Sequence, residues 1–460
     1  MTKKSKKQSR KQGRNQKQSF PVIEPNAAGI DVGATAHYVA VPADRDEQPV
    51  RRFGAFTEDL QALAQWLKQC GVTTVAMEST GVYWIPLYQL LQDYGFAVKL
   101  VNARHVKHVP GRKSDVSDCQ WLQQLATFGL LKASFRPEAK ICVLRSYMRQ
   151  REILVQSAAG HVQHMQKALT QMNLKLHHVI SDLTGLTGMA IIRAILAGER
   201  DRLKLAALKD WRIKSDSHTI AKALEGDYRP EHLFALRQAV ELYDYYQQKI
   251  AECDREILHE MKTLETRAEA AAPPKRKKRS SPNPFHFDSP AELYRVMGVD
   301  LTRIDGINEG TAQLILSELG LDLHKKWPTE AQFASWLGLC PNNEISGGKV
   351  LRRGTRKVVN RVAQALRMCA QSLLKSKSAL GAFARRLRAR RDKQIAITAT
   401  AHKLARLIYR MLKYGGEYVD IGQQKYEEKY RATVVKSLER RARQLGYQLV
   451  ANPTTATVVP

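Results

Sequence analysis

The first part of the chain alternates between short apolar runs and an amphipathic segment, a pattern typical of α/β domains. Apolar runs predict strands at 27–33, 37–41, 73–77 and 97–101. Leu60, Leu63 and Leu67 share one face of a predicted helix, which Thr57 would cap and Gly71 would end. Residues 21–140 are therefore predicted to form an α/β domain with a mostly buried sheet.

Beyond residue 140 the apolar residues follow heptad spacing, which predicts a helical coiled-coil region over 141–270. The first seam consists of Val155, Ala158, Val162, Met165, Leu169, Met172, Leu176 and Val179. The second seam consists of Leu236, Ala239, Tyr243, Tyr246, Ile250, Cys253 and Ile257. We expect two long helices that pack antiparallel or dimerise, with several short helices between them. A plain helical core stripe is the alternative, and the nearby histidines (161, 164, 177 and 178) are interpreted as a polar face.

The remaining segments differ in composition. Residues 1–20 are basic and almost free of apolar side chains, which predicts a disordered arm. Residues 271–290 contain a basic run between prolines and are interpreted as a linker. A mostly helical domain is expected over 291–446, and 447–460 as a frayed tail. Within that domain, 302–312 resembles a helix-hairpin-helix, with DNA contact and simple helix packing equally open.

Charge narrows the functional classes. The chain has 74 Lys and Arg against 44 Asp and Glu, a formal net charge of +30. Such an excess favours a polyanionic partner, because each neutralised phosphate releases condensed counterions. No run of 18 apolar residues occurs, and the N-terminal residues are polar. We therefore expect a cytoplasmic protein that does not associate with membranes. The six cysteines are widely spaced, which predicts reduced core residues.

Four acids occupy positions that suit a nuclease of the RuvC-like, ribonuclease-H-type fold. Asp31 lies in the first strand, Glu78 ends a later strand, and Asp115 and Asp118 open a helix that Ser114 would cap. A spacing of three places the last two on one helical face. Grouped carboxylates suit hard cations such as Mg²⁺. Individually, the helical acids could serve only the helix dipole, and Asp31 also fits a phosphate-binding turn of sugar-kinase-like ATPases.

Three motifs carry a resemblance to a known family. They are Gly29–Val32, Met77–Trp84 and Lys113–Asp118, and together they resemble the DEDD transposases of the IS110 family, to which Piv-type invertases are related. A later stretch, Gly338–Lys349, resembles the second catalytic segment of that family. Its part from Pro341 onward is similar to the IS1111 subgroup in particular.

The resemblance implies a RuvC-like domain, a coiled-coil segment and a mostly helical C-terminal transposase domain. It implies Mg²⁺, with Mn²⁺ as an alternative, at Asp31, Glu78, Asp115 and Asp118, and a nucleophilic serine at Ser346. It further implies donor and target DNA, a structured non-coding guide RNA, a homo-oligomer (dimer or tetramer) and a prokaryotic, nucleoid-associated protein.

The candidate serine lies in a predicted glycine-rich loop, where small neighbours let a phosphodiester approach closely. Basic residues around both catalytic segments are expected to contact nucleic acid: Lys113, Lys349, Arg352, Arg353, Arg356, Lys357 and Arg361. Two other functions stay open. One is a hydrolytic RuvC-like nuclease of the junction-resolvase type, in which water replaces the serine. The other is a non-catalytic nucleic-acid-binding protein whose acids are structural.

Overall fold

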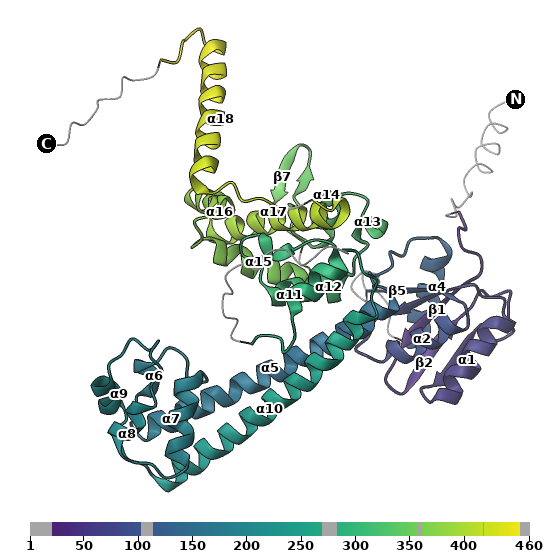
Figure 1. Ribbon diagram of the computed structural model, residues 1–460. Coiled ribbons are helices and arrows are strands. Elements are labelled where there is room, and N and C mark those ends of the chain that lie inside the picture. The colour runs from purple at the N-terminus through teal and green to yellow at the C-terminus, as the bar shows by residue number, and fades with distance from the viewer. Residues whose placement is uncertain are drawn as a thin grey trace, which may run out of the picture. The chain divides into compact units, whose positions relative to one another are not determined.

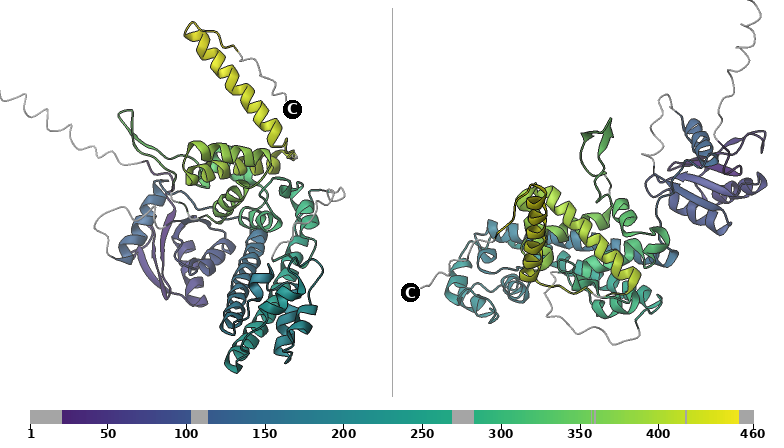
Figure 2. Two further views of the ribbon diagram at one scale, coloured as in Figure 1. Left: turned by 90° about the vertical axis from the view of Figure 1, so that its left-hand side faces the viewer. Right: turned by 90° about the horizontal axis from the view of Figure 1, so that it is seen from above.

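The computed structural model describes residues 21–102, 114–268, 283–356, 358, 360–416 and 418–450. The chain divides between Arg136 and Pro137 into two compact units, and each is described by itself. Figures 1 and 2 show the elements of both units. The predicted basic arm (1–20), the basic run 275–279 and most of the predicted tail lie outside the described residues.

A five-stranded mixed sheet forms the centre of the N-terminal unit. Its strands are β1 (Ala27–Val32), β2 (Ala36–Ala40), β3 (Val50–Gly54), β4 (Thr74–Glu78) and β5 (Ala97–Val101). They lie in the order β3-β2-β1-β4-β5. Strands β1, β4 and β5 are parallel, whereas β1–β2 and β2–β3 pair antiparallel. The predicted α/β class of this unit is confirmed, and all four predicted strands are present.

Strand β3 was not predicted, because its sequence lacks the alternation of a half-buried strand. It carries Arg51 and Arg52 at its centre and none of its residues is buried. The carboxylate of Asp46 accepts from Arg51 Nη2 at 2.9 Å and from the indole nitrogen of Trp66 at 2.9 Å. Polar contacts with the neighbouring helix therefore hold this edge strand.

Helices cover both faces of the sheet (Figure 2). Helices α1 (Thr57–Gln69) and α2 (Trp84–Asp93) pack with the larger apolar core on one face, and α4 (Asp115–Thr127) packs on the other. The prediction that Thr57 caps α1 is wrong. Thr57 is the first helical residue, and the Asp59 carboxylate accepts from the backbone N–H of Phe56 at 3.2 Å. A carboxylate in the first turn thus accepts from the N–H of the N-cap residue, which differs from the hydrogen bond expected of the threonine hydroxyl.

Two long antiparallel helices, α5 (Ala139–Gln171) and α10 (Pro230–Lys262), organise the C-terminal unit. Lys140 Nζ donates to the carbonyl of Thr263 at 3.4 Å, whereas the rings of His161 and Tyr246 stack with centroids 5.4 Å apart. Residue numbers increase along α5 while those of its contact partners on the other helix decrease, so the two helices run in opposite directions. The two long helices are confirmed, and of the two expected arrangements, antiparallel packing within one chain is present.

The first predicted seam is wrong at its end. Helix α5 stops at Gln171, and Asn173 adopts a left-handed conformation with φ 58°. A short polar side chain tolerates that conformation, so the chain turns there. Leu176 and Val179 belong instead to the short helix α6 (Leu176–Val179). The second seam, from Leu236 to Ile257, lies within α10 as predicted.

The segment between the long helices folds into short helices, as expected. They are α7 (Leu186–Leu196), α8 (Arg202–Ala207) and α9 (Ser217–Ala223). Their buried residues form one core cluster with the adjoining ends of α5 and α10.

A buried ion pair joins the two long helices. Arg151 Nε donates to Asp254 Oδ1 at 2.5 Å, and the guanidinium lies 4.0 Å from the centre of the Phe285 ring. Arg151 Nη2 also donates to the carbonyl of Pro284 at 3.0 Å, and the backbone N–H of His286 donates to Asp254 Oδ2 at 3.1 Å. Residues 284–286, which fall within the predicted linker, are thereby attached to the helical pair.

The rest of the C-terminal unit is helical apart from one hairpin. Its helices are α11 (Ser289–Met297), η1 (Leu301–Arg303), α12 (Glu309–Leu319), α13 (Leu323–Lys326), α14 (Glu330–Trp336), α15 (Arg361–Leu373), α16 (Ala379–Arg390), α17 (Lys393–Tyr414) and α18 (Gln423–Gln444). Strands β6 (Glu344–Ser346) and β7 (Lys349–Arg352) form this hairpin within the domain that was expected to be mostly helical. Every residue of these two strands is exposed, so no apolar alternation marks them.

The segment that resembles a helix-hairpin-helix packs against a neighbouring helix. Asn308 is the N-cap of α12, and its Oδ1 accepts from the backbone N–H of Thr311 at 2.9 Å. Gly306 has φ 90°, and a Cβ there would lie 3.1 Å from the carbonyl oxygen of Cys369 on α15. These contacts favour helix packing over DNA contact.

Two global expectations can be compared with the described residues. No helix among them is long and apolar enough to cross a membrane. All six cysteines are free, and four are buried, as predicted for reduced core residues: Cys70, Cys119, Cys253 and Cys369.

The packing of the long helices gives a first prediction. Leu169 is completely buried in α5, whereas Ile153 on the same helix is 56% exposed. Leu169→Glu places an unpaired charge in the core and should lower the free energy of unfolding by about 3 kcal/mol or more. Ile153→Glu, the matched control, should change it by less than about 0.5 kcal/mol. Urea unfolding followed by helical circular dichroism measures both, and equal midpoints would show that Leu169 is not a core residue.

Candidate active site

Asp31 and Glu78 occupy neighbouring positions at the carboxyl ends of two parallel strands. Ile30 on β1 is in register with Met77 on β4, so the acids that follow them are side by side. Ile30 and Met77 belong to the core beneath α1 and α2. Because side chains alternate along a strand, Asp31 and Glu78 lie on the opposite face, which α4 covers.

Helix α4 approaches β1 closely because residue 29 is glycine. A Cβ on Gly29 would lie 2.3 Å from the carbonyl oxygen of Cys119 and 2.3 Å from the backbone nitrogen of Gln123. No side chain fits in that space. Gly29 and Asp31 lie on the same face of β1, so this contact brings the helix to the strand end that carries Asp31.

The first turn of α4 carries the other two acids. Ser114 is its N-cap, as predicted, and its hydroxyl accepts from the backbone N–H of Ser117 at 3.3 Å. Asp115 is exposed and Asp118 half-buried. Near the other end of α4, Ala126 packs with Ala27 at the start of β1. The helix therefore runs antiparallel to β1, and its first turn lies toward the end of β1 that carries Asp31.

The immediate surroundings of the acids differ in polarity. Glu78 is buried, and its Oε1 accepts from the hydroxyl of Thr80 at 3.1 Å. Cys119 lies beneath Asp31 and Asp118, and burial raises the pKa of its thiol to about 12. Because the thiolate is the form that binds metals, this cysteine stays a neutral packing group near neutral pH.

The four acids suit a hard cation in kind, since all their donors are oxygens, and the elements that carry them meet at one end of the sheet. Their side chains are not gathered into a finished cage. Among the described residues, no three His, Cys, Asp or Glu side chains are close enough to hold one metal ion together. Lys113, which precedes the cap of α4, lies outside those residues.

The candidate nucleophile lies on an exposed hairpin in the C-terminal unit. The sequence placed Ser346 in a loop, but it is the last residue of β6 and pairs with Lys349 of β7. Gly347 and Gly348 form the two-residue turn with φ 53° and 76°, values that a hairpin of this type needs and that glycine adopts without strain. Ser346 is exposed at the end of the strand.

The predicted nucleic-acid contacts divide into two groups. Lys349, Arg352 and Arg353 are exposed on or next to the hairpin, and Arg352 Nη1 lies 3.8 Å from Glu344 Oε1 across it. The other described residues of the set bind protein groups. Arg356 donates to the carbonyl of Ser335, and Arg361 pairs with Glu152. Lys357 lies outside the described residues.

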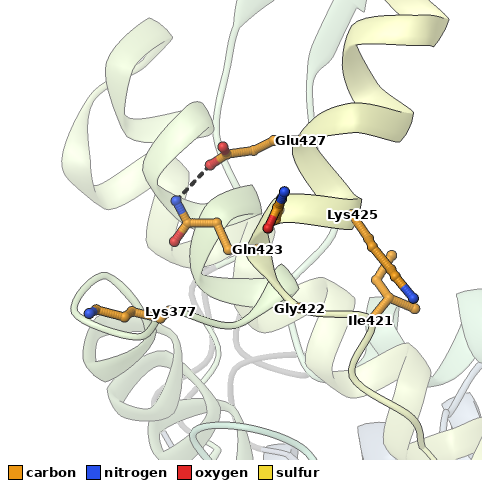
Figure 3. A pocket seen from close by; sticks show the side chains of 7 residues that line it. Lys377, Ile421, Gly422, Gln423, Lys425 and Glu427 are labelled. Atoms are coloured by element: carbon orange, nitrogen blue, oxygen red, sulfur yellow. Dashed lines mark hydrogen bonds between the residues drawn. The ribbon is translucent and has the colours of Figure 1, made fainter.

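Hollows in the C-terminal unit lie elsewhere. One, of about 490 Å³, opens at the start of α18 between Lys377 and the segment Ile421–Glu427 (Figure 3). There, Gln423 Nε2 donates to Glu427 Oε1 at 2.8 Å. Another, of about 440 Å³, lies between α16 and α17. Neither is lined by a residue that the sequence analysis singled out, so the candidate chemistry belongs to the strand ends and the hairpin.

Sequence reasoning missed two features of this region. The motif that contains Gly29 did not predict that this glycine allows α4 to pack closely on β1. A glycine inside a strand is the sequence signal for such a close approach. Sequence reasoning also assigned Arg356 and Arg361 to nucleic acid, because a cluster of cations does not reveal which of them bind carbonyls or carboxylates within the fold.

Comparison with known families gives two matches. Residues 28–174 match the IS110 DEDD transposase model, described as "Transposase". Residues 286–385 match a model described as "Transposase IS116/IS110/IS902 family". Together they cover a little over half of the chain. The chain belongs to the IS110 family of transposases. No curated protein sequence matches it.

Membership implies a DNA substrate for this IS110-family transposase. The first match contains all four acids, and the second contains the β6–β7 hairpin with Ser346. The predicted family is therefore confirmed.

The close approach at Gly29 gives a second prediction. Gly29→Ala introduces a Cβ 2.3 Å from the backbone of α4, which cannot yield as a flexible side chain could. We expect a loss of about 1–3 kcal/mol in the free energy of unfolding. Amide hydrogen exchange in α4 should become faster. Gly160→Ala on α5 is the matched control, because a Cβ there meets nothing within 4 Å. Unchanged exchange in α4 of Gly29→Ala would contradict the close contact.

Proposed function

We propose that this IS110-family transposase cuts and rejoins DNA with the two sets of residues described above. Asp31, Glu78, Asp115 and Asp118 bind the scissile phosphodiester through Mg²⁺ or Mn²⁺, and Ser346 is the nucleophile. The observation that carries the proposal is the convergence of β1, β4 and the first turn of α4 on one end of one sheet face. The mixed sheet with acids at these positions supports a RuvC-like fold for this unit.

The chemistry assigned to the chain's own groups is a phosphoryl transfer. The hydroxyl oxygen of Ser346 attacks phosphorus, the bond to one deoxyribose oxygen breaks, and the serine proton is lost as the leaving oxygen gains one. A hydroxyl of the recombining strand then attacks the phosphoserine phosphorus, the bond to the serine oxygen breaks, and the serine oxygen takes up a proton, so the strands are joined and the serine is restored. A divalent cation supplies charge that stabilises the attacking and leaving oxygens. Exposed Lys349 and Arg353 contribute further positive charge near the hairpin.

Exposure of the hairpin supports the role of Ser346. A hydroxyl that attacks a polymer must be reachable, and an isolated two-stranded hairpin with every residue exposed gains little from folding alone. The proposal requires one phosphodiester to be within reach of both the acids and the serine.

The remaining elements of the proposal concern partners. We assign the protein to the IS1111 subgroup, with a structured non-coding RNA of the element as guide and a homo-oligomer as the active form. The net charge of +30 supports binding of nucleic acid. Sequencing of RNA that co-purifies with the protein, compared with DNA beside the gene, tests the guide.

A third prediction concerns the acids. Asp31→Asn keeps the shape of the side chain but removes its charge, so cleavage should fall at least about 100-fold while DNA affinity and unfolding stay unchanged. Asp93→Asn is the control, because Asp93 ends α2 and thus lies away from the carboxyl end of β4. The assay uses end-labelled DNA carrying the element's ends, co-purified RNA and Mg²⁺. Full cleavage by Asp31→Asn would remove this acid from the site.

A fourth prediction separates the serine mechanism from hydrolysis by water. Wild-type protein should give a protein–DNA adduct on a denaturing gel, and Ser346→Ala should bind nucleic acid normally but form neither adduct nor recombinant. Ser346→Cys should keep a trace of activity, since a thiolate is also a nucleophile. Ser372→Ala, an exposed serine on α15, is the control. Cleavage without any adduct in wild-type protein would favour the hydrolytic nuclease, and an adduct in Ser346→Ala would place the nucleophile elsewhere.

A further inference from the structure

The loop that leaves β4 after Glu78 displays apolar side chains to solvent. Val82 is 67% exposed and Tyr83 is 47% exposed, immediately before α2 begins at Trp84. Leu87, Tyr88 and Leu91 of α2 are buried in the core. The exposed pair therefore forms an apolar tip at the end of the sheet where the candidate acids lie. We call Val82 and Tyr83 the aromatic tip.

The backbone of the tip is held in one conformation. Gly81 has φ 53°, and a Cβ there would lie 3.4 Å from the ring of Tyr83. The indole nitrogen of Trp84 donates to the carbonyl of Gly81 at 3.2 Å, and the N–H of Ile85 donates to the carbonyl of Val82 at 3.1 Å. Two hydrogen bonds therefore hold the turn that exposes the ring of Tyr83.

A pair of aromatic side chains in α2 lies next to this turn. The rings of Trp84 and Tyr88 meet edge to face with centroids 5.6 Å apart. The guanidinium of Arg136 lies 4.2 Å from the Tyr88 ring centre and 5.5 Å from that of Trp84. Because Tyr88 is buried, this aromatic pair is part of the core, whereas Tyr83 lies outside the core. Folding of this unit therefore does not account for the ring of Tyr83.

The tip lies within reach of nucleotides next to the acids. Tyr83 lies five positions after Glu78, and even a fully extended chain of that length spans at most about 18 Å. Successive base pairs of DNA are about 3.4 Å apart along each strand. A phosphodiester held at Glu78 therefore leaves only its nearest few bases within range of the tip. Aromatic rings stack on bases of any sequence because every base has an apolar face.

We propose that Tyr83 stacks on a base of the cut DNA strand close to the scissile phosphodiester, with Val82 packed against the same nucleotide. This inference rests on the proposed function, because it takes the acids as the place of cleavage. Tyr83 is a positioning residue in this view: it holds the strand so that the phosphodiester stays at the acids. The ring, rather than the phenolic hydroxyl, makes the contact.

A photochemical cross-link tests the contact directly. The cut is first mapped with wild-type protein, full-length and with its co-purified RNA, on duplex DNA carrying the element's end. 5-Iodouracil is then placed at each of the three positions on either side of the cut, with Ca²⁺ in place of Mg²⁺. We expect a cross-link to the peptide that contains Tyr83 at one or two adjacent positions. Tyr83→Leu should lose that cross-link while still binding the DNA.

Kinetics and base fluorescence separate stacking from a structural role. Tyr83→Leu should slow cleavage about tenfold, the order expected for one lost base–aromatic stack. It should also change the fluorescence of 2-aminopurine at the cross-linked position. Tyr83→Phe keeps the ring and should behave as wild type. Trp211→Ala removes an aromatic ring that is 87% exposed in the other unit, and should change neither signal.

The outcomes distinguish this inference from the function on which it rests. If wild-type protein cleaves but no position cross-links to Tyr83, or Tyr83→Leu cleaves at the wild-type rate, the stacking inference is wrong and the function stands. A cross-link from iodinated RNA instead of DNA also overturns it. A loss in Tyr83→Phe equal to that in Tyr83→Leu assigns the effect to the hydroxyl and contradicts stacking. If wild-type protein cuts no DNA, the proposed function itself fails.

Discussion

The close packing of α4 on Gly29, a residue without a side chain, is the constraint on which the candidate active site depends. Backbone atoms of α4 lie only 2.3 Å from where a Cβ on Gly29 would be, so any other residue pushes the helix away from β1. Asp31 comes from the same strand, and Asp115 and Asp118 from the first turn of that helix. Segments more than 80 positions apart in the chain therefore meet at one end of the sheet, because a glycine in β1 leaves room for the backbone of α4.

Much of the fold could be predicted from the sequence, for reasons specific to each element. Buried strands such as 27–32 are continuous apolar runs, and the seams of α5 and α10 keep their spacing because each packs on the other. Strand β3 and the β6–β7 hairpin escaped prediction because no core demands alternation from them. The end of α5 depends on the conformation of Asn173, which heptad spacing does not encode.

The candidate site was less predictable, because charge alone does not say what a charged group binds. Several cationic side chains serve the fold by pairing with carboxylates. Glu318 pairs with Arg145 and Arg149, and Glu330 binds Arg410 and Arg406, which hold the pKa of that carboxyl below its usual value. The positions of the acids and the resemblance to the family singled out the candidate acids and serine, whereas the hairpin that carries Ser346 and the exposed tip at Tyr83 are features of the structure alone.

Both ends of the basic segment between α10 and α11 are fastened to one body. Before it, the N–H of Ala268 donates to the carbonyl of Arg295 at 3.2 Å; after it, His286 binds Asp254. The helices that follow are thus positioned by these bonds and not by the length of the connection. Doubling that length would cost only about 0.6 kcal/mol of closure entropy. Insertions between Ala268 and Asn283 should therefore be tolerated, which makes this the natural place to graft a tag or an additional binding module.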